Sequence, residues 1–254
     1  MAITLSSMTN IATLTQSANL AIAKHGGGVS SDPFGAANLR VEQQLSSTDV
    51  KLSSFSQIKA GFASLQTAAT DLSDPKKTGT SADIVKAAQS FATAYNNTGN
   101  AVSLAINGDS KTSGTLAGDV RAGLASNDLK SIVSSGSNTA DLKKIGINLK
   151  SDGTLSVDTV ALQSAIQADS SAVKDTLSRI GKQAEQVSTK ELATTGNVGR
   201  SVNMLSNLSN SLETQLVEQT RLAAASRDAV QRQAASFSYT AASGIESYMN
   251  IFSL

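Results

Sequence analysis

The chain has 254 residues, and its 21 Lys and Arg side chains balance 20 Asp and Glu side chains. It has one His and no Cys, which excludes a disulfide scaffold and thiolate metal sites, and the charge balance without a basic patch argues against a nucleic-acid partner. Aromatic residues make up only 4% of the chain and Ser and Thr about a quarter, a mixture that suits long helices packed through small side chains.

The first 23 residues carry apolar side chains at spacings of three and four, which predicts a helix with one apolar side. The residues that define this side include Leu5, Met8, Ile11 and Ile22. An ordinary surface helix on the protein's own core would show this pattern, but we favour a terminal helix that is buried only against other subunits. The segment lacks the basic and apolar regions of a cleavable signal peptide, and no stretch approaches the ~18 apolar residues of a membrane span.

A long helix is predicted from residue 36 to residue 72, because its apolar residues recur at the three-and-four spacing of a coiled-coil seam. The seam is assigned to Leu45, Leu52, Phe55, Phe62 and Leu65. Pro75 ends the helix, because the residue before a proline avoids the helical region. A short linker, 75–80, then leads to a second helix over 81–106, capped by Thr80 or Ser81, and a third helix follows over 116–134.

Residues 145–157 predict a β-hairpin, because apolar and small or polar residues alternate on both sides of Asp152-Gly153. A two-residue turn would mix the two faces. A three-residue loop, 151–153, sets Leu149 opposite Leu155 and Ile147 opposite Val157, so that all the apolar side chains share one face. Gly153 then supplies the left-handed residue that such a turn needs, and we choose this register.

Helices follow the hairpin up to the C-terminus. Asp158 is predicted to cap one helix, and Asp169 or Ser170 a second, with a break near 194–196. The longest stretch without Gly or Pro runs from residue 200 to residue 243 and is predicted to pair antiparallel with the 36–72 helix, which brings the chain ends together. Its seam is assigned to Leu205, Leu208, Leu212, Leu216 and Leu222.

The last eighteen or so residues hold four of the nine aromatic residues, and apolar side chains recur there at spacings of four, four, three and four. A tail helix paired only with the first 23 residues would leave much of this surface exposed, and such a patch usually marks an interface. A core packed beneath the first helix is the other interpretation. The predicted assembly residues of the tail are Phe237, Ile245, Tyr248, Met249, Ile251, Phe252 and Leu254.

Three ordered segments point to a known family: 91–97 (Phe-Ala-Thr-Ala-Tyr-Asn-Asn), 114–119 (Gly-Thr-Leu-Ala-Gly-Asp) and 142–158, the hairpin with its flanks. Over about residues 84–180 the chain resembles the flagellar filament capping protein, also called hook-associated protein 2. In that family large variable domains, which form the plate of the cap, lie between the first long helix and the Tyr-Asn-Asn segment. Here six residues bridge that gap, so the resemblance implies a minimal form without the plate.

The residues give little support for an enzyme. The lone His25 lies beside three glycines that follow no recognisable strand, so neither a catalytic triad nor a phosphate loop is indicated. Asp152-Gly153 lacks the later carboxylates of a calcium loop. We therefore expect no catalysis, no cofactor and no metal.

The predicted fold is mostly α: an elongated antiparallel coiled-coil bundle with a small β-hairpin subdomain and paired terminal helices. Residues 1–35 and 236–254 are predicted to form a terminal helical assembly domain, and 36–235 a coiled-coil domain that includes the hairpin subdomain, 142–180. The absence of Cys fits chance, and it also fits a protein that must avoid disulfides during export.

The resemblance implies an exported structural component of the bacterial flagellum that forms a homo-oligomer at the filament tip and promotes flagellin assembly. Its partners would be flagellin, hook-associated proteins, the flagellar export apparatus and an export chaperone, with no nucleic acid and no membrane insertion. The alternative, favoured by the missing plate, is a minimal flagellin-like or hook–filament junction subunit that polymerises into a helical filament. A secreted adhesin outside the flagellum is a third interpretation.

Overall fold

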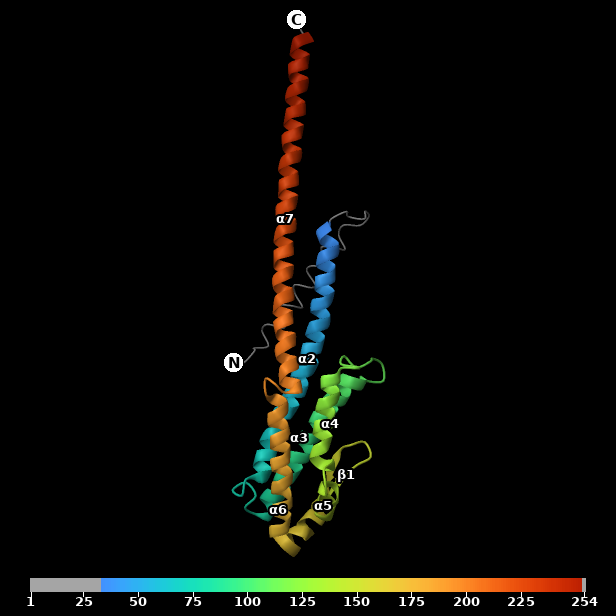
Figure 1. Ribbon diagram of the computed structural model, residues 1–254, viewed down its shortest axis with the longest axis vertical. Coiled ribbons are helices and arrows are strands. Elements are labelled where there is room, and N and C mark those ends of the chain that lie inside the picture. Colours follow the sequence, from blue (N-terminus) through green and yellow to red (C-terminus); the bar gives the residue numbers. More distant parts are fainter. Residues whose placement is uncertain (1–32, 253–254) are drawn as a thin grey trace. The chain divides into compact units, whose positions relative to one another are not determined.

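The computed structural model describes residues 33–252. Its elements are six helices and two strands in the order α2 (Pro33–Ser73), α3 (Ser81–Asn107), α4 (Val120–Ser134), α5 (Asn138–Lys144), β1 (Ile147–Leu149), β2 (Leu155–Val157), α6 (Thr159–Leu192) and α7 (Asn197–Phe252) (Figure 1). The prediction of a mostly α fold with one small β-hairpin is confirmed. The predicted helix over residues 1–23 lies outside the described residues.

Residues 41–217 form one compact unit, and the described residues 33–40 and 218–252 belong to a second. The predicted division, with boundaries after residues 35 and 235, likewise assigns the two chain ends to one unit. It stays a prediction, since residues 1–32 lie outside the described part. The elongation of the bundle and the pairing of the terminal helices also stay predictions.

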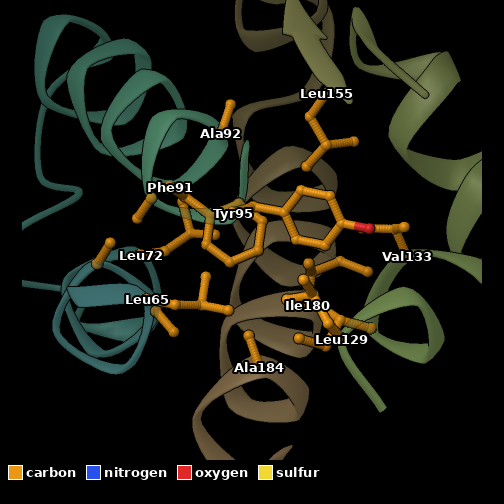
Figure 2. Packing of buried hydrophobic residues seen from close by; sticks show 14 of the residues in the cluster. Leu65, Leu72, Phe91, Ala92, Tyr95, Leu129, Val133, Leu155, Ile180 and Ala184 are labelled. Carbon is orange, nitrogen blue, oxygen red and sulfur yellow. The ribbon is translucent and has the colours of Figure 1, made fainter. Parts of the chain in front are cut away.

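The larger unit has its core where α3, α4 and α6 contact one another and α2 adds a stripe of buried residues. This stripe repeats at spacings of three and four, as predicted: Phe55, Ile58, Phe62, Leu65, Ala69 and Leu72. Figure 2 shows the ring of Tyr95 at the centre, with Leu65 and Leu72 of α2 on one side and Leu129, Val133 and Leu155 on the other. Burial raises the pKa of Tyr95 to about 12, so the phenol stays neutral.

Hydrogen bonds between α2 and later helices fix which segments lie side by side in this unit. The Ser73 hydroxyl donates to the Ser178 carbonyl (3.4 Å), the Gln66 amide donates to the Thr189 hydroxyl (2.7 Å), and the Ser209 hydroxyl donates to Asp49 (2.6 Å). Residue numbers thus decrease along α2 as they increase along α6 and α7, so α2 runs antiparallel to both helices. The sequence predicted residues 200–243 as the partner, but α6 is the partner of the C-terminal half of α2.

The ends of the helices follow the predicted caps in several places. Thr80 and Asp83 form a capping box at the start of α3, in which the Thr80 hydroxyl accepts the Asp83 N–H (3.2 Å) and Asp83 accepts the Thr80 N–H (3.1 Å). Asp169 has non-helical dihedral angles inside α6 and accepts the Ala172 N–H (3.0 Å), so it caps a second helical segment as expected. The third helix begins at Val120 instead of residue 116, because Asp119 is its N-cap.

The short helix α5 was not predicted, and β1 is shorter than the pattern suggests because Ile145 ends α5. Seven residues are too few to show an apolar period. The helix is held instead by the side chain of the buried Asn138, which donates to the Ile132 carbonyl (2.8 Å) and to Gln183 (2.7 Å) and accepts from Arg179. These bonds join α5 to α4 and α6.

The hairpin has the predicted register. Ile147 pairs with Val157 and Leu149 with Leu155, and the Lys150 N–H donates to the Thr154 carbonyl (2.8 Å), which leaves a three-residue loop. Gly153 has a φ of 84° in this loop, and a Cβ added there would meet no atom within 4 Å. Gly146 precedes β1 with a φ of 82°, but a Cβ there would come within 2.8 Å of the Leu162 nitrogen at the start of α6.

These two glycines give a matched pair of variants. We expect Gly153→Ala to cost about 1 kcal/mol of unfolding free energy, because only the backbone strain of positive φ applies. Gly146→Ala adds a steric clash with α6 and should cost about 2–4 kcal/mol. Urea unfolding followed by circular dichroism measures both.

Gly123, inside α4 with no atom within 4 Å of an added Cβ, is the control. Gly123→Ala should stabilise the protein by up to about 1 kcal/mol. Equal losses in the Gly146 and Gly153 variants would contradict the close approach of Gly146 to α6.

Candidate assembly surfaces

The C-terminal part of α7 carries large apolar side chains that are exposed. Phe237 is 67% exposed and Tyr239 is 79% exposed, and Val230 and Leu222 are exposed as well. An aromatic ring exposed on a helix leaves a large apolar area in water, and of these two rings only that of Phe237 lies in the predicted stripe, since Tyr239 is about 200° further round the helix. Phe237, one of the predicted assembly residues, is therefore exposed in the single chain, as a residue of an assembly interface must be.

The other predicted assembly residues can be located only in part. Ile245, Tyr248, Met249, Ile251 and Phe252 belong to α7, which continues as one helix through residue 252. Leu254, together with the N-terminal set Leu5, Met8, Ile11 and Ile22, lies outside the described residues. The assembly surface as a whole stays a prediction.

The predicted seam residues differ in burial. Phe55, Phe62, Leu65 and Leu212 are buried, and Leu45, Leu52, Leu205 and Leu216 are half-buried. Leu208 is 47% exposed and Leu222 is 43% exposed. Phe55, Phe62 and Leu65 belong to the core cluster that α3, α4 and α6 share, so these three pack in a multi-helix core.

The hairpin is attached to the helical core through the side chain of Asn96 on α3. Its amide group donates to the Leu155 carbonyl (2.8 Å), and its carbonyl oxygen accepts the Leu155 N–H (2.7 Å). The side chain thus pairs with both backbone groups of a β2 residue, in the way a neighbouring strand would. The adjacent Tyr95 is buried beneath Leu155 (Figure 2), which explains why Tyr and Asn occur together in this segment.

The acidic residues of the three motif segments serve turns and helix ends. The Asp119 carboxylate accepts the Arg121 and Ala122 N–H groups (2.9 and 3.0 Å), and the Asp158 carboxylate accepts the Val160 and Ala161 N–H groups (both 3.0 Å). Asp152 accepts the hydroxyl and the N–H of Thr154 in the hairpin turn, and these hydrogen bonds lower its pKa. These side chains are therefore engaged in holding the backbone.

Residues 33–252 contain no group of three His, Cys, Asp or Glu side chains placed to hold a metal ion. Over the same residues, no helix has a segment both long and apolar enough to span a membrane. One buried carboxyl was not predicted, that of Glu191 at the end of α6. Its sequence neighbours Lys190 and Leu192 give no local pattern that would distinguish it from a surface glutamate.

The geometry describes a helical structural protein whose motif residues are occupied by folding roles and whose last helix exposes apolar side chains. Comparison with protein families finds a match over residues 78–252 to the family described as the flagellar hook-associated protein 2 C-terminus. The chain belongs to this family, which is flagellar, exported and structural. The resemblance noted from the three motif segments is confirmed, whereas a comparison with curated proteins finds no match.

The role of Asn96 can be tested directly. Asn96→Ala removes two hydrogen bonds to Leu155 and leaves its backbone groups unpaired at the edge of the hairpin, so we expect a loss of about 1–3 kcal/mol in unfolding free energy. The neighbouring Asn97 is exposed, and Asn97→Ala is the control, with an expected change within about 0.5 kcal/mol. Chemical denaturation measures both, and equal effects would contradict the attachment through Asn96.

Proposed function

We propose that this chain is an exported, filament-cap-like component of the bacterial flagellum that oligomerises at the filament tip and promotes flagellin assembly. The observation that carries the proposal is the family match over residues 78–252. It is supported by the exposed apolar side chains of α7, because a family of flagellar structural proteins works by assembly and requires an interface. The mechanism is binding and conformational adaptation, without covalent chemistry.

The interface of this proposal lies on the C-terminal stripe of α7 and the apolar side of residues 1–23. Residues 237, 241, 245, 248 and 252 follow one another at spacings of four, four, three and four, which on a continuous helix puts them within one narrow sector. Each large side chain buried on assembly contributes about 1.5–3 kcal/mol. Several such residues per subunit are enough to drive oligomerisation against the loss of rotational and translational freedom.

The proposed partners follow from the family and from the absence of any other recognition chemistry in the motif residues. They are further copies of this chain, flagellin and hook-associated proteins at the filament end, and the export apparatus with an export chaperone before assembly. The proposed location is the extracellular flagellum.

The connection between α2 and α3 supports the alternative of a minimal flagellin-like or junction subunit. The Asp74 carbonyl accepts the N–H groups of Lys77 and Thr78 (3.0 and 3.1 Å) and the Thr78 hydroxyl (3.0 Å), and Thr78 is buried. The connection is therefore a closed turn, at the place where the resemblance implies the plate domains of the cap. A subunit without a plate has only terminal helices, a coiled-coil domain and a hairpin, which is the composition expected of a minimal flagellin-like or junction subunit.

Imaging of the purified, concentrated protein by negative-stain electron microscopy separates the two. A cap forms small closed rings and localises to filament tips, whereas a flagellin-like subunit forms long filaments. Loss of secretion in a strain without the flagellar export apparatus is expected for both. Secretion that persists in that strain would contradict a flagellar role altogether.

The assembly surface is tested with Tyr248→Ala combined with Phe252→Ala. We expect the double variant to keep the helical content and the melting temperature of the monomer but to lose assembly, as measured by sedimentation velocity. Tyr239→Ala is the matched control: it removes an exposed aromatic ring from the same helix, two residues and about 200° from Phe237. It should leave assembly intact.

A large fall in the melting temperature of the monomeric double variant would show instead that Tyr248 and Phe252 are internal core residues. Loss of assembly in the Tyr239 variant as well would show that the surface is not confined to the stripe.

A further inference from the structure

The only Asn-Gly pair of the sequence lies at the C-terminal end of α3. Asn107 is the exposed last residue of the helix, and Gly108 follows as its C-cap with a φ of 75°. A Cβ added to Gly108 would come within 1.9 Å of the Thr112 carbonyl oxygen, so the fold requires glycine at this position. The residue that follows Asn107 therefore has no side chain to shield its backbone nitrogen.

An asparagine followed by glycine is chemically labile, because its side-chain amide can react with the backbone nitrogen of the next residue. That nitrogen loses its proton to solvent base and attacks the Asn Cγ atom, the new N–Cγ bond closes a succinimide ring, and Nδ2 leaves as ammonia. Water then opens the ring at either of its carbonyl groups, which gives aspartate or isoaspartate. The net change is the uptake of water and the release of ammonia, with no oxidant or reductant.

The folded chain holds both reacting groups in hydrogen bonds. The Gly108 N–H donates to the Leu104 carbonyl (2.9 Å), which closes the last turn of α3. The Asn107 amide donates to the Ser103 hydroxyl (3.2 Å), one turn earlier, so the side chain lies back along the helix instead of over the Gly108 nitrogen. Both hydrogen bonds must break before the reaction can begin.

The segment that follows can open without disturbing the core. Residues 109–113 are exposed, and the hydrogen bonds that the structure describes there join Asp109 to other residues of the same segment. The next buried side chain is that of Leu116, whose N–H donates to the Ala105 carbonyl (2.7 Å). A segment with few buried apolar contacts opens locally at a low cost in free energy. Opening of residues 107–113 alone is therefore enough to free both reacting groups.

We propose that Asn107 is a site of spontaneous deamidation and that the hydrogen bonds at the end of α3 control its rate. The aspartate product places a negative charge at the helix C-terminus, where the helix dipole disfavours it. The isoaspartate product adds a backbone carbon before Gly108, which displaces its N–H from the Leu104 carbonyl. Either product weakens the end of α3, and modified chains accumulate with time because the amide is not regenerated.

The test is peptide mapping by mass spectrometry after the full chain has been kept in mildly alkaline buffer, once folded and once unfolded in urea. Chromatography separates the aspartate and isoaspartate forms of the peptide. We expect Asn107 to react in both samples, but on the order of tenfold or more slowly in the folded chain, because the reaction there waits for opening. Asn100 is exposed on the same helix but is followed by Ala101, so it is the internal control and should stay unmodified in the folded chain.

Variants of two serines of α3 test the protection itself. Ser103→Ala frees the Asn107 amide and should speed the reaction of the folded chain roughly two- to tenfold, as expected for the loss of one hydrogen bond. Ser90→Ala is the matched control, because Ser90 is exposed on the same helix and the change gives the same gain in helix propensity. Its reaction rate should equal that of the parent chain.

Three results would overturn the proposal. Equal rates in the folded and unfolded chains, or in the Ser103 and Ser90 variants, would show that the hydrogen bonds at the end of α3 do not control the reaction. A folded chain in which Asn107 stays unmodified long after the unfolded chain has reacted completely would show that the site is closed in the native protein. All these readouts concern the single chain, so they are independent of the proposed flagellar role.

Discussion

The packing of one α3 segment, Phe91 to Asn96, holds the larger unit together. A chain with only nine aromatic residues has few large side chains with which to fill space between helices. Here Phe91 and Tyr95 fill the space between α2, α4 and α6 and small residues such as Ala92 and Ala184 allow the helices to approach (Figure 2). Asn96, one residue further on, attaches the hairpin to the same helix. The helical core and the β subdomain therefore depend on less than two turns of α3.

Much of this arrangement could be predicted because it depends on short-range signals. The hairpin register follows from alternation and from one glycine, and the caps at Thr80, Asp158 and Asp169 follow from the ability of short polar side chains to accept free N–H groups. The α2 stripe could be recognised by its period. The period does not identify the helix that packs against this stripe, because apolar stripes of the same period are interchangeable as partners. The sequence therefore could not show that α6 is the partner of the C-terminal half of α2.

The features that the sequence did not reveal depend on long-range polar contacts. Asn138 and Glu191 look like surface residues, and each is buried where residues of other helices satisfy its side chain: Ile132 and Gln183 for the first, Asn197 and Val198 for the second. No local pattern reports such partners, because they are six to 45 positions away and belong to other helices. The assembly residues differ again, since their proposed partners belong to other molecules.

The closed turn between α2 and α3 has an evolutionary consequence. The end of α2 is held by the buried Leu72 in the core, and the Thr80–Asp83 capping box belongs to α3, so both helix ends are fixed without help from the exposed residues 75–77 between them. Loop-closure entropy rises only slowly with loop length. A folded domain whose own termini lie close together can therefore be gained or lost at residues 75–77 with little effect on the stability of the bundle. Related proteins are therefore expected to differ greatly in chain length at this site.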